Sequence, residues 1–133
     1  MKMKHVKDMV AEANEVVEHM PGAEAQALHG REDVTFVDLR DVRELERDGM
    51  IPGAFHCPRG MLEFWIDPAS PYAKPQFQSG NRFVFYCASG WRSALSARAA
   101  HEMGLANVSH IEDGFKGWKE SGGPVAQRPA EKG

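Results

Sequence analysis

Two long apolar runs stand in the middle of the chain. Residues 34–39 and 83–87 are apolar almost throughout and rich in Val and Phe. Such continuity is typical of strands that are buried on both faces, as in a parallel sheet covered by helices. Shorter strands are predicted within the following segments: 16–20, 54–57 and 107–112.

Helical patterns separate these strands. The apolar side chains of residues 3–17 recur at helical spacing and form one stripe opposite the charged side chains. The alanine-rich stretch that follows Ser93 predicts a helix with Ser93 as its cap and Gly104 at its end. Residues 67–80 contain three prolines and no periodicity, so we expect a loop there. Further short helices are predicted within these segments: 22–30, 41–49, 59–66 and 114–123.

The alternation of strands and helices predicts an α/β fold with a parallel sheet and helices on both faces. A length of 133 residues suits one domain. We expect an N-terminal amphipathic helix over residues 1–15 as an extension, one domain over residues 16–124, and a flexible polar tail over residues 125–133. In such sheets ligands bind beyond the carboxyl ends of the strands, where Cys87 and Asp38 stand.

Charge and composition exclude several classes of function. The formal net charge is −3 at pH 7, and basic side chains alternate with acidic ones, so we expect no nucleic-acid partner. No stretch approaches the roughly 20 apolar residues that cross a bilayer, and acidic residues interrupt the basic N-terminal segment. We therefore expect no membrane partner and a cytoplasmic protein whose two cysteines are reduced.

Cys87 ends the second long strand, just before a helix. The free backbone N–H groups at a helix start, and the permanent charge of Arg92, would both favour its thiolate form. Gly90 would let the intervening loop curl so that successive N–H groups converge on one anion. The pattern predicts a nucleophilic cysteine. The alternative is a small apolar residue buried at a strand end.

Four stretches, in this order, resemble the rhodanese family of sulfurtransferases over residues 16–124. The resemblance departs from the family at Met50, where a histidine is usual. The four stretches and their matched residues are VDLRDVREL (Asp38, Arg40, Glu44), GMIPGAFHCP, CASGWRS (Cys87, Gly90, Arg92) and EDGFKGWKESGGPV (Asp113, Trp118).

The resemblance implies a single rhodanese-like domain with a central parallel sheet of about five strands. It implies a sulfurtransferase in which Cys87 takes a sulfane sulfur from a donor such as thiosulfate and becomes a persulfide. An acceptor such as cyanide, a small thiol or a protein thiol then removes that sulfur. We expect no cofactor, and no zinc site, because the cysteines and histidines form no close ligand pair beyond the adjacent His56 and Cys57. The residues it assigns to binding the persulfide are Ala88, Ser89, Gly90, Trp91 and Arg92.

Two other functions stay open. Cysteine phosphatases and arsenate reductases resemble this site, but they have five residues between cysteine and arginine, commonly after a histidine. Here four residues lie between Cys87 and Arg92, and Tyr86 precedes the cysteine. Asp67 is a remote candidate for the general acid that a phosphatase would need. The third function is a non-catalytic binding or regulatory module that retains the fold.

Three residues near strand ends are candidates for supporting roles. Asp38 would support the loop, pairing with Arg92 or Arg43, or would cap the short helix that follows it. Arg40 and Arg59 are candidates for steering anions to the site, or are ordinary solvated surface charges.

Cys57 is either a second thiol that resolves an oxidised Cys87 or a core residue, and the core role is favoured. Trp91 would wall the pocket or pack on the loop of residues 67–80. A group of aromatic residues flanks that loop, as core anchors or as the wall of an acceptor groove. Its members are Phe64, Trp65, Tyr72 and Phe77.

Overall fold

A single parallel sheet forms the centre of the computed structural model, which describes residues 2–129. Its five strands lie in the order β1-β5-β4-β2-β3, and every pair of neighbours is parallel. The sheet confirms the α/β fold that the sequence predicts. The strands are β1 (Glu18–Met20), β2 (Val34–Asp38), β3 (Phe55–His56), β4 (Arg82–Tyr86) and β5 (Val108–Ile111).

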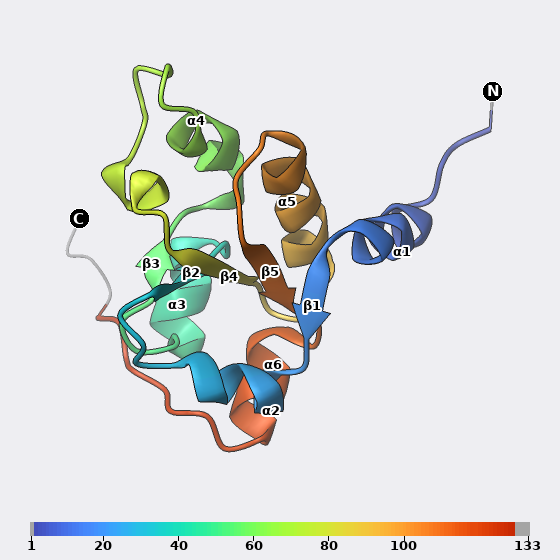
Figure 1. Ribbon diagram of the computed structural model, residues 1–133. Coiled ribbons are helices and arrows are strands. Elements are labelled where there is room, and N and C mark those ends of the chain that lie inside the picture. The colour runs from blue at the N-terminus through green and yellow to red at the C-terminus, as the bar shows by residue number, and fades with distance from the viewer. Residues whose placement is uncertain (1, 130–133) are drawn as a thin grey trace.

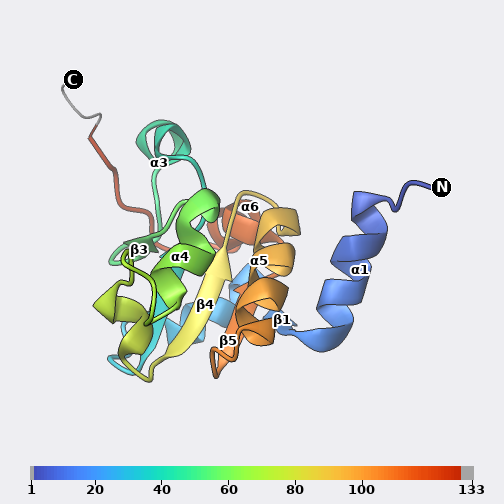
Figure 2. The same ribbon diagram turned by 90° about the horizontal axis from the view of Figure 1, so that it is seen from above.

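Helices cover both faces of this sheet. In Figure 1, α4 and α5 lie above the sheet and α2 and α6 lie below it, while α1 projects to one side. Figure 2 shows α1 standing beside α5, away from the remaining helices. The helices are α1 (Val6–Val16), α2 (Gly22–Ala25), α3 (Val42–Asp48), α4 (Leu62–Ile66), α5 (Trp91–Glu102) and α6 (Gly114–Glu120), with short 3-10 turns at Gln26–Leu28, Arg59–Met61 and Pro75–Gln78.

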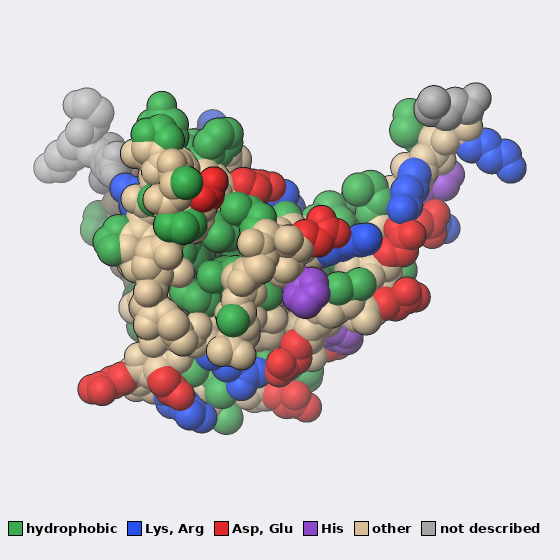
Figure 3. All heavy atoms as spheres, turned by 45° about the horizontal axis from the view of Figure 1, so that its top comes forward, with side chains coloured by type: hydrophobic (Ala, Val, Ile, Leu, Met, Phe, Trp, Pro, Cys, Tyr) green, Lys and Arg blue, Asp and Glu red, His purple; other side chains and the backbone are tan. Residues whose placement is uncertain are grey.

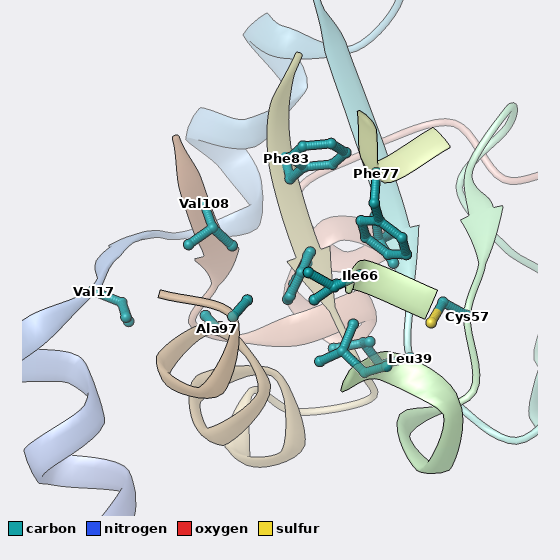
Figure 4. Packing of buried hydrophobic residues seen from close by; sticks show 12 residues of the cluster. Val17, Leu39, Cys57, Ile66, Phe77, Phe83, Ala97 and Val108 are labelled. Carbon is teal, nitrogen blue, oxygen red and sulfur yellow. The ribbon is translucent and has the colours of Figure 1, made fainter. Parts of the chain in front are cut away.

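The side chains of β4 alternate between two apolar layers, because successive residues of a strand point to opposite faces. Phe83 and Phe85 lie in the layer that α4 and α5 cover, whereas Val84 and Tyr86 lie in the layer against α2 and α6. Both layers therefore contain side chains of the same central strand, which ends at Tyr86, directly before Cys87. The side chains labelled in Figure 4 belong to the first layer: Val17, Leu39, Cys57, Ile66, Phe77, Phe83, Ala97 and Val108.

Helix α1 packs on α5 through a narrow apolar stripe. Val10 and Ala13 are buried and form a small cluster with Ala94 of α5. Val17, just beyond the helix, joins the core layer under α5. The observed helix is shorter than the predicted one over residues 3–17, because the extended backbone of His5 and of Val17 bounds it.

The start of α5 differs from the prediction. The helix begins at Trp91, and Gly90 rather than Ser93 occupies the N-cap position, with a left-handed φ of 103°. The physical reason is the tertiary contact of Ser93, whose hydroxyl is buried and bonds to His110 of β5 at 2.9 Å.

The described part of the C-terminal tail pairs with the residue that follows Gly49. Met50 and Ala126 exchange two backbone hydrogen bonds, of 2.9 and 2.8 Å, which join the start of the tail to the residue after Gly49. Flexibility of residues 125–133 stays a prediction. Residues 130–133 of that tail lie outside the described residues. Among the helices within residues 2–129, none combines the length and the apolar character needed to cross a membrane.

Candidate active site

Cys87 lies directly after β4 and its side chain is buried, with 1% of the residue exposed. The backbone N–H of Gly90 donates a hydrogen bond to Cys87 Sγ at 3.2 Å. Gly90 is required here for two reasons. Its φ of 103° is left-handed, and a Cβ on it would lie 2.0 Å from the carbonyl oxygen of Glu112. The loop therefore curls back on the sulfur, as the sequence predicts.

The start of α6 holds this loop from behind. The N–H of Phe115 donates to the carbonyl of Cys87 at 2.8 Å, and that of Lys116 donates to the carbonyl of Ala88 at 3.2 Å. A Cβ on Gly114 would lie 2.4 Å from the Ala88 oxygen, so this contact also requires glycine. The first two carbonyls of the loop are thus bound by α6.

The first turn of α5 supplies further donors. Ala94 is the first residue of this region whose N–H binds within the helix, to the carbonyl of Gly90 at 3.1 Å. The N–H groups of Trp91, Arg92 and Ser93 therefore have no partner within the helix. Together with the Gly90 N–H, they make the site suited to bind a negative charge.

Arg92 forms a bidentate ion pair with Glu44 of α3, with both N–O distances at 2.9 Å. The pKa of Arg92 is raised, mainly by the hydrogen bonds to Glu44 and to a smaller extent by Cys87. The Arg92 charge is therefore shared between the loop and Glu44. Glu44 has a second role, because it completes the capping box of α3 with Asp41.

Asp38 and Arg40 form a buried ion pair with each other. The exposed fractions of their side chains are 0% and 1%, and the two shorter N–O distances are 2.8 and 3.0 Å. Arg40 also donates to the carbonyl of Gly49 at 2.8 Å and lies over the ring of Phe115 at 4.5 Å. Arg40 therefore does not face solvent to steer anions. It ties the end of β2 to α3 and to the start of α6, and so supports the loop indirectly.

The pairing expected for Asp38 with Arg92 or Arg43 is not found, because Arg43 binds Asp41 at 3.1 Å and Arg92 binds Glu44. Proximity in the chain decides the Asp38 pair: Arg40 is two residues away on the same buried turn.

Arg59 lies in a groove between α1 and α5 with a volume of about 380 Å³. It pairs with Glu63 at 2.8 Å, and about a third of its side chain is exposed. Steering of anions by Arg59 stays a prediction. Trp91 is 51% exposed and lines a neighbouring hollow with His5 and Lys7, so it stands against the start of α1.

Cys57 is a core residue. It is fully buried among Leu39, Leu62 and Ile66, and Figure 4 shows its sulfur within this apolar layer. Burial raises the pKa of its thiol to about 12. At neutral pH Cys57 therefore stays a protonated thiol, which argues against a resolving role.

The aromatic group around residues 67–80 divides into two pairs. Phe77 is buried and Trp65 packs on the same core layer, in line with core anchors. Phe64 and Tyr72 are 53% and 58% exposed and contact each other edge to face at 6.3 Å between ring centroids. In Figure 3 hydrophobic side chains gather on the body of the molecule, whereas the projecting N-terminal segment carries mostly charged ones.

Three residues at the site were not predicted from the sequence to belong to it, although Ser93 was predicted to cap the following helix. Ser93 Oγ accepts a hydrogen bond from Cys87 Sγ at 3.7 Å, His110 Nδ1 lies 2.9 Å from Ser93 Oγ, and Asn14 Oδ1 lies 2.7 Å from His110 Nε2. Burial is the main cause that lowers the pKa of His110 to about 4. A signal was available, because a histidine inside an apolar strand needs buried partners.

Metal binding has no geometric support in the described part of the chain. Across residues 2–129, no three His, Cys, Asp or Glu side chains come together in a group that could hold an ion.

Comparison with known proteins gives a family and a mixture of named activities. A solved protein of unknown function and possible tyrosine phosphatase, from Rhodopseudomonas palustris CGA009, is 57% identical, with a TM-score of 0.91 over 95% of this chain and 97% of that one. The dual specificity phosphatase Cdc25 of Arabidopsis thaliana is 28% identical over 120 residues, which cover 84% of this chain and 79% of that protein.

A relative named for sulfur transfer also matches. The solved polysulfide-sulfur transferase homodimer of Wolinella succinogenes is 25% identical, with a TM-score of 0.68 over 92% of this chain and 87% of that one. The model of the rhodanese-like domain matches residues 22–121, which include the four strands from β2 to β5 and the Cys87 loop with its α6 support. The chain therefore belongs to the family of rhodanese-like domains.

Proposed function

We propose that the protein is a sulfurtransferase that carries a sulfane sulfur as a persulfide on Cys87. The observation that carries the proposal is the loop from Cys87 to Arg92, which closes on the sulfur through the Gly90 N–H at 3.2 Å. A donor set of this size suits one anionic sulfur atom. Sulfurtransferase relatives such as the Wolinella succinogenes protein support the same activity.

The reaction has two displacements. The Cys87 thiolate attacks the outer sulfur of a donor such as thiosulfate, the sulfur–sulfur bond of the donor breaks, and sulfite leaves with the electron pair. The product is a persulfide, with its negative charge on the terminal sulfur. A thiolate or cyanide then attacks that sulfur, and Cys87 leaves as a thiolate. No external oxidant or reductant is consumed.

Electrostatic stabilisation is the main contribution of the protein to these steps. The N–H groups of Gly90 and of the first turn of α5 would bind the terminal sulfur as its charge develops. The Arg92 guanidinium adds positive charge, moderated by its pairing with Glu44. The buried Asp38–Arg40 pair keeps the elements behind the loop in place.

Phosphatase activity is the second candidate, because two relatives carry phosphatase names. Three features of this chain weigh against it. The loop has one residue fewer than the phosphatase pattern, and Tyr86 stands where a histidine is common. Asp67, the candidate general acid, accepts a hydrogen bond from the N–H of Ala69 at 2.9 Å and so serves a local turn.

Intact-mass measurement after incubation with thiosulfate tests the proposal. We expect a gain of one sulfur atom in the wild type and in Cys57→Ala, removal of that sulfur by cyanide, and no gain in Cys87→Ala. Hydrolysis of p-nitrophenyl phosphate, dependent on Cys87, together with no sulfur loading would establish the phosphatase instead. If the protein shows neither sulfur loading nor phosphatase activity, the remaining function is that of a binding module.

The proposal also covers the sulfur donor, the sulfur acceptor and the cellular compartment of the protein. The donor is a small sulfane-sulfur compound, and the acceptor is cyanide or a thiol on a small molecule or a protein. A reducing compartment such as the cytoplasm would supply thiol acceptors in quantity.

A further inference from the structure

A continuous chain of hydrogen-bonded side chains runs from α1 to the sulfur of Cys87. Asn14 Oδ1 lies 2.7 Å from His110 Nε2, and His110 Nδ1 lies 2.9 Å from Ser93 Oγ. Ser93 Oγ in turn lies 3.7 Å from Cys87 Sγ. The four residues come from α1, β5, the first turn of α5 and the end of β4.

This series of hydrogen-bonded side chains is shielded from solvent over most of its length. Ser93 and His110 are fully buried, and Cys87 is 1% exposed. Asn14, which is half-buried, lies next to Ala13, whose contact with Ala94 fixes α1 on α5. The only other acceptor near the Ser93 hydroxyl in the described residues is the carbonyl of Gly90, at the longer distance of 3.3 Å.

The chemistry of the groups sets a direction along the chain. A side-chain amide oxygen can only accept, so His110 Nε2 carries the proton that it donates to Asn14. Nδ1 of a neutral imidazole then accepts the hydroxyl proton of Ser93. A lone pair of Ser93 Oγ is left to accept the S–H of Cys87, which is the direction in which that contact runs.

We propose that Asn14 is a positioning residue for Cys87: by fixing the tautomer of His110, it orients Ser93 to receive the thiol proton. The inference rests on the proposed role of Cys87 as nucleophile. It makes α1 a part of the site, although Asn14 lies outside residues 22–121, which match the family model.

Two coupled proton transfers along the hydrogen-bonded side chains produce the thiolate. The S–H proton passes to Ser93 Oγ while the proton of Ser93 passes to His110 Nδ1. The products are a thiolate, a hydroxyl that now donates to that thiolate, and an imidazolium. The thiolate then has two donors, the Ser93 hydroxyl and the Gly90 N–H. Burial keeps His110 neutral at pH 7, so that Nδ1 can accept, but it also lowers the pKa of His110 to about 4 and disfavours the imidazolium. The charge-separated pair is therefore a short-lived state that forms as the thiolate attacks.

Other titratable groups face His110 from two elements. His19 of β1 lies with its ring centroid 6.0 Å from that of His110, and Glu112, just after β5, binds His19 at 2.9 Å. The neighbouring His19 ring lowers the pKa of His110 and the Glu112 carboxylate raises it, and both contribute less than burial.

Two substitutions at Asn14 separate positioning from packing. Asn14→Leu removes the acceptor of the His110 proton. Asn14→Asp keeps an acceptor at the same place and adds a negative charge that stabilises imidazolium. Glu15→Leu is the matched control, because Glu15 is exposed on the same helix. Each substitution is made in Cys57→Ala, which leaves Cys87 as the one cysteine of the chain.

The measurement is the rate of iodoacetamide alkylation of Cys87 from pH 6 to pH 9, followed by intact mass. We expect Asn14→Leu to lower the rate at pH 7 about two- to tenfold, the range that a neutral hydrogen bond supports. We expect Asn14→Asp to move the midpoint of the profile to lower pH than in Cys57→Ala, and Glu15→Leu to follow Cys57→Ala. The proposal would be overturned if the pH profile of alkylation for Asn14→Leu coincided with that of Cys57→Ala. It would also be overturned if the profile for Asn14→Asp coincided with that of Asn14→Leu.

A second measurement uses the unaltered protein. Long-range ¹H–¹⁵N NMR correlation at pH 7 reports which ring nitrogen of His110 carries the proton. The Nε2–H tautomer is expected, and the Nδ1–H tautomer would contradict the proposal. Both readouts are independent of sulfur loading, so they distinguish a failure of this inference from a failure of the proposed sulfurtransferase activity.

Discussion

At the scale of single residues, glycines decide how the loop closes on Cys87. Gly90 and Gly114 both have positive φ, and both approach a backbone carbonyl so closely that a Cβ would overlap it. Ordinary side chains are thus excluded by contact as well as by conformation. The two contacts join the Cys87 loop to the turn between β5 and α6.

Gly90→Ala tests this closure. The substitution adds a strained φ and an overlap with the Glu112 oxygen, so we expect the free energy of unfolding to fall by about 3 kcal/mol or more and sulfur loading to be lost. Gly30→Ala is the control, because Gly30 has a similar φ of 86° with no atom within 4 Å of its Cβ position. That variant should lose about 1–2 kcal/mol in urea unfolding and keep its activity.

His110 predicts a dependence of stability on pH. Its pKa in the folded protein is about 4, below the ordinary 6.5, because burial disfavours the charged form. The unfolded chain therefore binds the proton more tightly. The contribution of His110 is fully present above about pH 6.5 and is lost as pH falls toward 4.

We expect the wild type to lose about 2 kcal/mol more than His110→Gln between pH 7 and pH 4.5, measured by urea unfolding. Equal losses in the two proteins would show that His110 accepts a proton in the folded state as easily as in the unfolded chain.

The sequence predicts the residues of the Cys87 loop but not all of their partners. Cys87, Gly90 and Arg92 follow from a strand end, a helix start and the resemblance. Ser93 was assigned as a cap because its local pattern permits it, whereas its hydroxyl is bound by a histidine 17 residues further along the chain. The Asp38–Arg40 and Arg92–Glu44 pairs likewise depend on how elements meet, which local pattern does not specify.

At the scale of elements, α1 is attached to α5 through a few small apolar side chains. Its buried residues are Val10 and Ala13, and Ala13 is 0% exposed against α5. The contact is close because alanines face each other, so it also leaves no room for a larger or charged group.

Ala13→Asp is expected to detach α1 while the rest of the domain stays folded, because burial of an unpaired carboxylate is costly. Hydrogen exchange of the α1 amides should then accelerate by at least about tenfold, which corresponds to a loss of about 1.4 kcal/mol of local stability. Ala11→Asp, on the exposed side of α1, is the control and should exchange as the wild type does. If both variants exchange alike, the Ala13 contact does not hold the helix.

Most elements were predictable because their apolar patterns are strong. The continuous runs at β2 and β4 specify strands buried on both faces, and their residues indeed alternate between two covered layers. The bounds of α1 and α5 were less accurate by a few residues, because helix ends depend on backbone contacts such as that of Gly90 with Glu112.

At the scale of the whole molecule, the two core layers share one sheet. The residues of β4 enter both layers, so neither can be lost without disrupting the other. We expect one cooperative thermal transition for residues beyond α1, with near- and far-ultraviolet circular dichroism giving the same midpoint. A calorimetric enthalpy well above the van't Hoff enthalpy would instead indicate that the layers unfold separately.

The contact between Gly90 and the carbonyl of Glu112 bears on redesign of the site. Widening the loop by one residue, to accommodate a tetrahedral oxyanion, would have to displace the Glu112 carbonyl and the Gly114–Ala88 contact at the same time. An insertion in the loop alone would clash with the backbone of Glu112 and Gly114, which the loop already contacts closely. A change of substrate class in this scaffold therefore requires coordinated replacement of two segments that lie more than twenty residues apart in the chain, the Cys87 loop and the turn that leads into α6.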